Sequence, residues 1–201
     1  LHSTCANPAC NRFGYGFVQG ASAAAKEKGI TVEIKYSYKY GSTFSASTEL
    51  QTQIAGWYAS GTEVVFACGG SMFQSVLSAA SEYENAKIIG VDVDQSAESS
   101  KVITSAMKGL SASVERILGQ FYDGKWDSEL ADKAQNLGAA EGATGLPEDT
   151  WSMKNFTVEQ YKALFKKVAD GEIVPDSKTP DDANNADWLK GIPNVTIDFE
   201  A

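Results

Sequence analysis

The chain has 201 residues, 43% of them hydrophobic, which is enough to bury a substantial core as one large domain or two small ones. Its 26 Asp and Glu residues outnumber its 17 Lys and Arg residues, and the net charge of −9 argues against nucleic acid or an anionic membrane surface as the main partner. No apolar run approaches the roughly 20 residues that a membrane-spanning helix needs.

The amino-terminal part begins with a strand pattern, followed by a helix and a second strand. Leu1–Thr4 already has the pattern of a strand, so we expect the natural precursor to be longer. Apolar residues spaced three and four apart over residues 12–28, followed by Gly29, predict a helix with a C-terminal glycine. Residues 31–38 alternate between apolar and polar, as a half-buried strand does.

The same alternation of helix and strand continues to about residue 125. Gly41 and Ser42 predict a turn, and the elements after it are predicted as helices over residues 47–60, 72–83 and 111–122 and strands over 63–68, 87–91 and 101–105. The strand at 63–68 is apolar on both faces, which is typical of a parallel strand covered by helices on both sides. Residues 1–125 are therefore predicted to form an α/β lobe with an open, doubly wound parallel sheet.

Residues 126–201 have a different character. Gln135–Pro147 is rich in small residues and turn formers, which predicts a crossing or hinge segment. An amphipathic helix over 158–169 and a short strand over 194–199 follow, with an acidic, exposed loop predicted between them. We expect this part to be a hinge crossing and tail, separate from the first lobe.

The cysteines and the histidine indicate neither a metal site nor redox chemistry. Cys5, Cys10 and Cys68 are accompanied only by His2, and no metal-ligand spacing links them. Cys5 and Cys10 either form a disulfide across a short loop or pack as two small thiols, and the sequence leaves both alternatives open.

Polar or glycine residues follow three predicted strands. Ligands of open α/β sheets bind beyond the carboxyl ends of the strands, so these residues are candidates for a binding site. Gly69 and Gly70 precede a helix and can offer their amides to a ligand oxygen, or simply form a tight turn. The Asp92 carboxylate can accept hydrogen bonds from sugar hydroxyls, and Lys108 can pair with it or be a solvated surface lysine.

Aromatic residues close to these strand ends can stack on a flat ring. Phe13, Tyr15 and Phe66 are the candidates, although core packing is an equal alternative for Phe66. Asp92 and Asp94 follow a strand and are not interpreted as a catalytic dyad, and Asp94 can instead cap the next helix. No nucleophile elbow is present either, so the sequence does not favour an enzyme.

Five segments, in order along nearly the whole chain, resemble the basic membrane protein family of ABC-transporter lipoproteins. They are Asn11–Gly20, Gly61–Gly70, Ile89–Gln95, Thr104–Lys108 and Gly138–Leu146, and the Gly-Val-Asp-Val-Asp-Gln run with its downstream lysine is the most specific. The best-understood members of that family are purine nucleoside receptors. The two cysteines Cys5 and Cys10 depart from the small apolar residues that are usual in the family at that place.

The resemblance implies a type I periplasmic-binding-protein fold, with a nucleoside held between two lobes. It implies that Phe66 stacks on the base, that Asp92 and Lys108 grip the ribose, and that the Gly69–Gly70 turn lines it. Residues from about 137 would return to a second lobe. It further implies an extracytoplasmic lipoprotein that is anchored by lipid through an upstream segment, works with an ABC transporter permease, and needs no cofactor.

Two other functions remain open at this point. One is a regulatory domain that senses a ligand and contacts a partner protein. The other is a nucleotide-using α/β enzyme, which the Gly69–Gly70 turn favours but the missing phosphate-loop lysine spacing opposes. Fold alone does not decide among these functions.

Overall fold

The computed structural model describes residues 2–3, 8–40, 43–178 and 187–200. Four sequence predictions therefore lie wholly or partly outside the described residues: the ends of the first strand, the state of Cys5, the turn at Gly41–Ser42, and the acidic loop before the last strand.

Strands and helices alternate through the first half of the chain. The elements are β1 (His2–Ser3), α1 (Pro8–Lys28), β2 (Val32–Ser37), α2 (Thr48–Ala59), β3 (Val64–Cys68), α3 (Met72–Ser81), β4 (Lys87–Asp92) and β5 (Val102–Lys108). The second half is α4 (Leu110–Tyr122), β6 (Thr144–Gly145), α5 (Val158–Ala169) and β7 (Val195–Glu200), with short helical turns η1 (Ser96–Glu98), η2 (Trp126–Leu130), η3 (Ala139–Glu141) and η4 (Asp187–Leu189). These bounds confirm the predicted elements to within a few residues.

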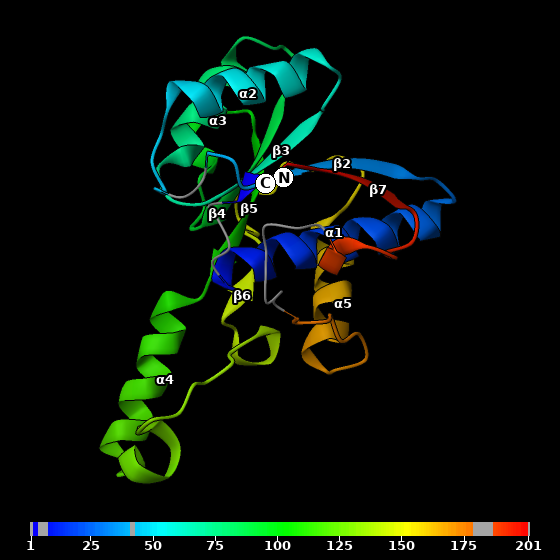
Figure 1. Ribbon diagram of the computed structural model, residues 1–201. Coiled ribbons are helices and arrows are strands. Elements are labelled where there is room, and N and C mark those ends of the chain that lie inside the picture. The colour runs from blue at the N-terminus through cyan, green and yellow to red at the C-terminus, as the bar shows by residue number, and fades with distance from the viewer. Residues whose placement is uncertain (1, 4–7, 41–42, 179–186, 201) are drawn as a thin grey trace.

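The strands form one sheet in the order β6-β5-β4-β3-β1-β2-β7. All neighbouring pairs are parallel except β5 and β6, which are antiparallel. Helix α1 covers one face of the sheet, and α2 and α3 cover the other (Figure 1). The prediction of an open, doubly wound α/β sheet is thus confirmed.

Each face of the sheet carries its own core, and β3 contributes to both. Val65 and Ala67 pack with α2 and α3, whereas Phe66 and Cys68 pack with α1. This alternation follows from the two-residue period of a strand, which sends successive side chains to opposite faces. Phe66 therefore belongs to the core beneath α1.

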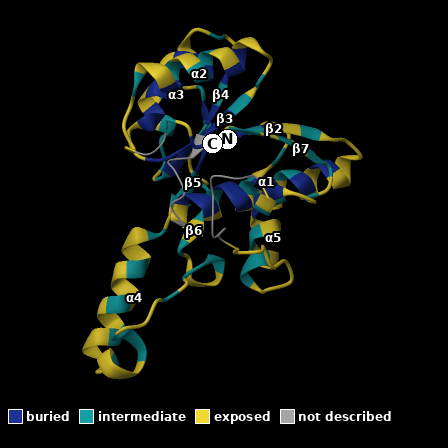
Figure 2. Ribbon diagram, viewed as in Figure 1, coloured by how far each residue is buried: buried dark blue, intermediate teal, exposed yellow. Residues whose placement is uncertain are grey.

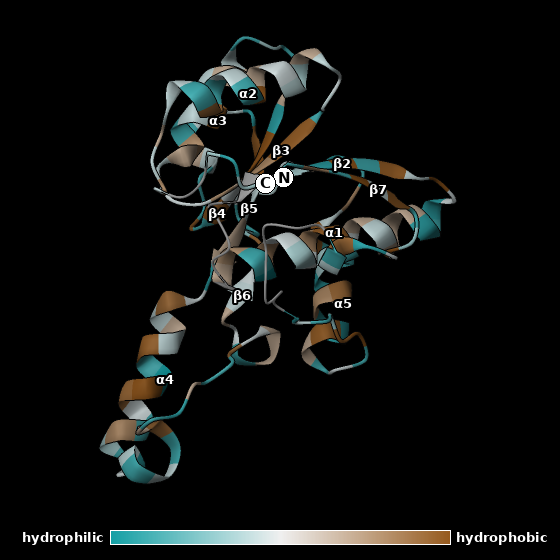
Figure 3. Cartoon of the chain, in the orientation of Figure 1, coloured by the Kyte–Doolittle hydropathy of each residue, from teal (hydrophilic) through white to brown (hydrophobic). Residues whose placement is uncertain are grey.

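Helix α4 leaves the sheet and projects away from the rest of the molecule (Figure 1). None of its residues is buried, although its sequence has an apolar stripe (Figures 2 and 3). Leu110, Val114, Leu118 and Phe121 are each about half exposed. The predicted lobe of residues 1–125 includes this helix, but in the structure none of its residues is buried against the sheet.

Part of the predicted tail belongs to the sheet. β7 pairs with β2 over its whole length, from Val32 opposite Val195 to Ser37 opposite Glu200. Just before β7, Trp188 packs its ring edge against Tyr36, and Leu189 is buried in the same cluster. The boundary at residue 125 is therefore not a boundary of this sheet, because the apolar residues of β7 complete the core on the α1 face.

Among the described residues, no helix combines the length and the apolar character required to cross a bilayer.

Candidate functional site

The site is built on an ion pair at the carboxyl ends of two adjacent strands. Asp92 ends β4 and Lys108 ends β5, and the Lys108 ammonium lies 2.7 Å from Asp92 Oδ1. Each side chain is 40% exposed, so solvent weakens the pair and a ligand can reach it. Asp92 Oδ1 itself is buried, and among the described residues its one charged contact is the Lys108 ammonium, so the exposed part of the Asp92 side chain lies at its other atoms.

The backbone holds Asp92 in an uncommon conformation. Its φ of 69° lies in the left-handed region, which few residues other than glycine adopt. Just before it, Val91 N–H donates to Gln95 Oε1 at 2.9 Å, and Gln95 N–H donates to Ser105 Oγ at 3.1 Å. Gln95 thus ties the end of β4 to β5 and fixes where the Asp92 carboxylate points.

Gly90 leaves the room that Gln95 needs. A Cβ at Gly90 would lie 2.6 Å from both Gln95 Oε1 and Ser105 Oγ. The glycine and the glutamine of the Gly-Val-Asp-Val-Asp-Gln run are therefore structural supports for the carboxylate between them.

A group of aromatic rings lies next to the ion pair. The Lys108 ammonium sits 5.1 Å from the centre of the Phe13 ring, within cation–π range. The Phe13 ring in turn meets Phe66 edge-on at 6.3 Å between ring centres, and Phe17 contacts Phe66 from a second side at 5.7 Å. Phe66 is only 2% exposed, so in this structure its ring supports Phe13 and is closed to a ligand.

Tyr15, the other aromatic candidate, lies away from the ion pair. Its ring packs against Trp188 at 5.4 Å, and its hydroxyl donates to Asp176 at 3.3 Å. The helix period explains this difference, since residues two apart on α1 point in different directions.

The glycine turn after β3 adopts backbone conformations that suit glycine. Gly69 and Gly70 have φ values of 155° and 48°. A Cβ at Gly70 would lie 2.7 Å from the Phe44 carbonyl oxygen, which accepts hydrogen bonds from Ser71 N–H at 3.0 Å and Ser71 Oγ at 3.2 Å. The turn is therefore built around close contact with Phe44.

Phe44 is a residue that the sequence analysis missed. It has a left-handed φ of 57° and its side chain is 38% exposed beside the glycine turn. Residues 43–46 have neither helical nor strand periodicity, so only the three-dimensional contact with Gly70 reveals it.

Cys68 connects the turn to the ion pair. A hydrogen bond with Cys10, burial, and the charge of Asp92 all raise the pKa of the Cys68 thiol, and the charge of Lys108 opposes them. Cys68 ends β3 one residue before Gly69, and β3 lies beside β4, which ends at Asp92, so the glycine turn and the ion pair follow neighbouring strands.

Asp94 has a separate, structural role. Its Oδ1 accepts from Ser96 N–H at 2.9 Å at the start of η1, and its Oδ2 accepts from Thr150 Oγ1 at 2.7 Å. Burial acts to raise the pKa of Asp94, but these hydrogen bonds outweigh it and lower the pKa. Asp94 thus accepts the first N–H of η1, as the capping alternative expects, although Gln95 and not Asp94 occupies the N-cap position.

The chain returns next to the site. β6 pairs with β5 in antiparallel fashion, with Lys108 opposite Thr144 and Met107 opposite Gly145. Gly109 N–H donates to Ala143 O at 2.9 Å, and a Cβ at Gly109 would lie 2.4 Å from Gly142 O. The outgoing and returning segments thus run side by side directly after Lys108.

Metal chemistry finds no support in the described part of the chain, which contains no cluster of three or more His, Cys, Asp or Glu side chains able to hold an ion.

Comparison with known proteins gives consistent results. The family model of PnrA-like ABC transporter substrate-binding proteins matches residues 4–178. An ABC transporter nucleoside-binding protein, BmpA of Lactococcus lactis subsp. cremoris (strain MG1363), is 30% identical over 184 residues, covering 83% of this chain and 49% of that protein. This chain therefore spans about half the length of the curated relative that it matches.

A solved structure shares the fold. A solute-binding protein of an ABC transporter system from Aeropyrum pernix K1 superposes with a TM-score of 0.69 at 21% identity, over 94% of this chain and 59% of that one. Since the family model covers far more than half of the residues, the chain belongs to the PnrA-like family of ABC transporter substrate-binding proteins.

Proposed function

We propose that this chain forms one lobe of an extracytoplasmic solute receptor that binds a purine nucleoside and passes it, chemically unchanged, to an ABC importer. The observation that carries the proposal is the Asp92–Lys108 ion pair, half exposed at the carboxyl ends of β4 and β5. This is the edge at which open α/β sheets bind ligands. Membership of a substrate-binding family supports the receptor role.

The ion pair suits a vicinal diol such as that of ribose. The Asp92 carboxylate accepts hydrogen bonds from two neighbouring hydroxyl groups, and the Lys108 ammonium donates to their oxygens. Hydrogen bonds to charged groups are stronger than neutral ones, so the pair gives both affinity and orientation. The printed name of BmpA, a nucleoside-binding protein, supports a ribose over another polyol.

A purine base stacks on an aromatic ring, and the exposed fraction of each ring indicates which residue is available for this contact. Phe66 is covered by Phe13 and Phe17, so a base reaches it only after those rings move. Phe44 is exposed at the Gly69–Gly70 turn and can stack on a purine without rearrangement. We assign stacking to Phe44 and a supporting role under Lys108 to the Phe13–Phe66 pair.

The crossing segments next to Lys108 fit a receptor that closes over its ligand. β5 leaves the sheet toward α4 and β6 returns beside it, so residues 108–109 and 142–145 form a double connection. Rotation about such a connection brings a second lobe onto the strand ends. We propose residues 135–147 as part of this hinge.

The remaining parts of the proposal concern location and partners. A receptor of this family works outside the cytoplasm, with the transporter permease as protein partner and a lipid anchor on a segment upstream of Leu1. The surplus of acidic residues is consistent with a neutral solute as ligand instead of nucleic acid.

The test is calorimetric titration of the complete natural protein with inosine, guanosine and adenosine. Asp92→Asn and Lys108→Met should each weaken binding by about 30-fold or more, in line with the loss of a charged hydrogen-bond partner. Lys166→Met, which breaks a comparable exposed ion pair with Asp170 on α5, is the matched control and should bind normally. Absence of heat with all three nucleosides would rule out a nucleoside as the ligand. Release of free base from any of them would show that the protein is an enzyme and not a receptor.

A further inference from the structure

Two cysteines lie together where the first turn of α1 meets the end of β3. Cys10 belongs to that first turn, and Cys68 is the last residue of β3. Both side chains are thiols in the core between α1 and the sheet, with exposed fractions of only 7% and 1%. The two thiols share a hydrogen bond, so their sulfur atoms are in direct contact. The proposed binding mechanism does not use this contact.

A buried hydrogen bond next to Cys10 fixes the position of the first turn of α1. Asn11 follows Cys10 and is only 1% exposed. Its Oδ1 accepts a hydrogen bond from the Tyr38 hydroxyl at 2.5 Å, and Tyr38 lies just after β2. A buried polar side chain that is hydrogen-bonded holds its segment in one place, because breaking the bond leaves both groups without a partner. The direction of the Cys10 side chain is therefore set by the fold.

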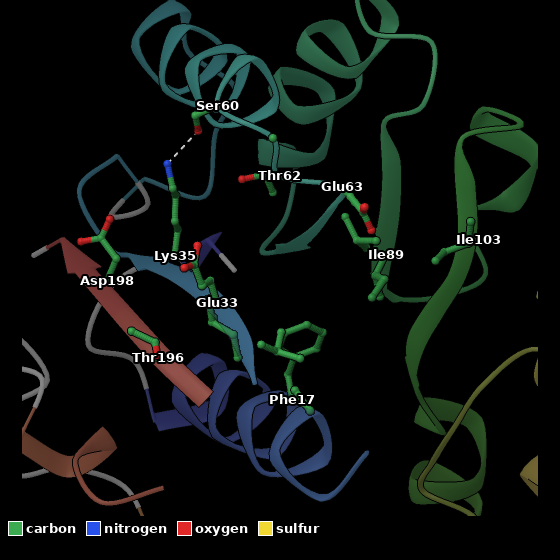
Figure 4. Close-up of a pocket in the computed structure, with 15 residues that line it drawn as sticks. Phe17, Glu33, Lys35, Ser60, Thr62, Glu63, Ile89, Ile103, Thr196 and Asp198 are labelled. Carbon is green, nitrogen blue, oxygen red and sulfur yellow. Dashed lines mark hydrogen bonds between the residues drawn. The ribbon is translucent and has the colours of Figure 1, made fainter. Parts of the chain in front are cut away.

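The same face of α1 contacts β3 a second time. Phe66 lies two residues before Cys68, so both side chains point to the α1 side of the sheet. The ring of Phe17 points from α1 toward the sheet, at the edge of the cavity in Figure 4, and contacts Phe66 at 5.7 Å between ring centres. Phe17 comes about two helical turns after Cys10, so both residues lie on one face of the helix. Two contacts on this face thus join α1 to β3.

We propose that Cys10 and Cys68 are a covalent modification site, and that they form a disulfide bond between α1 and β3. The inference rests on the proposed function, because an extracytoplasmic receptor works in an oxidising compartment, where disulfides form and persist. A disulfide requires two cysteines whose side chains face each other at short range. Two thiols that are already in contact meet this requirement without a rearrangement of the sheet.

The oxidant that the step requires is a disulfide compound. The thiolate of one cysteine attacks the oxidant, which forms a mixed disulfide and releases one thiol. The other cysteine then attacks the protein sulfur of the mixed disulfide, and the second thiol of the oxidant leaves. Two cysteine thiols are thereby oxidised, one disulfide is reduced to two thiols, and the protons of the cysteines pass to the released thiols.

The surroundings of Cys68 indicate when this exchange takes place. The hydrogen bond with Cys10 and burial both raise the pKa of the Cys68 thiol. The thiolate is the reactive form, so the folded chain reacts slowly with an oxidant. The bond therefore forms during folding, before α1 covers Cys68.

The bond joins the two elements that flank the ion pair. Phe13 lies one turn after Cys10 on α1 and contacts the Lys108 ammonium. Gly69 directly follows Cys68. A covalent link between α1 and β3 thus holds Phe13 and the glycine turn at a fixed separation, which favours a preformed binding site. Closing the chain between residues 10 and 68 also restricts the unfolded state and so stabilises the fold.

The experiment refolds the reduced, complete natural protein in a mixture of oxidised and reduced glutathione, with a parallel sample in dithiothreitol. Remaining thiols are alkylated, and the tryptic peptides are analysed by mass spectrometry without reduction. Trypsin cuts after Arg12, Lys39 and Lys87, so Cys10 and Cys68 lie in separate peptides. We expect these peptides to be linked in the glutathione sample and separate in the dithiothreitol sample.

Variants show which cysteine carries the link, because Cys5 shares a tryptic peptide with Cys10. Cys5→Ala should keep the link to Cys68, and Cys10→Ala should abolish it. The link should raise the melting temperature by about 5–15 °C relative to the dithiothreitol sample. Cys68→Ala, which cannot form the link, is the matched control and should melt at the same temperature in both buffers.

Three results would overturn the inference: no linked peptides in the glutathione sample, a bond between Cys5 and Cys10 instead, or a link that persists in Cys10→Ala. These measurements need no ligand. Their failure therefore leaves nucleoside binding untouched, and a failed nucleoside titration leaves the disulfide untouched.

Discussion

A methyl group added at Gly90 should strongly destabilise the end of β4. In Gly90→Ala the new Cβ would lie 2.6 Å from Gln95 Oε1 and 2.6 Å from Ser105 Oγ, well inside van der Waals contact. Gln95 must then move, and its hydrogen bonds with Val91 and Ser105 are lost. Two hydrogen bonds at about 1 kcal/mol each, together with about 1–3 kcal/mol for overpacking, give a destabilisation of about 3–5 kcal/mol.

Urea unfolding followed by circular dichroism measures this loss. Gly20→Ala is the matched control, because no atom lies within 4 Å of the new Cβ on α1, and it should raise stability by up to about 1 kcal/mol. If Gly90→Ala unfolds within about 0.5 kcal/mol of the parent, as ordinary surface changes do, then Gln95 does not lock the strand end and the reasoning about Asp92 fails.

Three further predictions concern parts of the fold around the site. Thr157→Ala removes the N-cap of α5 and should cost about 1 kcal/mol in urea unfolding, and an unchanged midpoint would argue against the cap. Leu118→Ala on α4, where the side chain is 49% exposed, should lower the free energy of unfolding by less than about 0.5 kcal/mol. Leu50→Ala in the core should lower it by about 2–5 kcal/mol. Equal losses of stability would mean that another surface covers α4. The pKa of Asp94 is lowered, so its contribution to stability is present above its ordinary pKa and is lost as the pH falls through the pKa of the folded state. Thr150→Val removes a hydrogen bond to the Asp94 carboxylate and should raise this pKa in an NMR titration. An unchanged pKa would contradict the role of the Thr150 hydroxyl.

Local periodicity was enough to predict most of the elements of this fold. The helical spacing in residues 12–28 and the alternation in 31–38 correspond to α1 and β2, because each element buries a face and the pattern records that burial. The apolar stripe of α4 is equally clear in the sequence, yet none of its residues is buried in the structure. A stripe shows that a face is apolar, and it does not say which surface covers it.

Pairing between strands far apart in the chain could not be predicted from the sequence. The strand at 195–200 was predicted, but its place beside β2 depends on the two apolar faces meeting in the folded chain. For the same reason, the sequence did not show that the sheet includes a strand beyond residue 125.

The contact between the two charged candidates could be predicted from the sequence, whereas the surroundings of the aromatic candidates could not. Asp92 and Lys108 follow strands that are neighbours in the sheet, so reading the strand ends was enough to bring them together. For Phe66 the decisive fact is the direction of its side chain, which points into the core beneath α1. Phe44 could not be found at all, since its position depends on a left-handed backbone and a close contact with Gly70.

The most direct test of the account is an experimental structure of the complete natural protein with inosine bound. We expect ribose hydroxyl oxygens within about 2.5–3.2 Å of both the Asp92 carboxylate and the Lys108 ammonium, with the base against Phe44. A nucleoside bound elsewhere, with the Asp92–Lys108 pair still closed on itself at 2.7 Å, would contradict it.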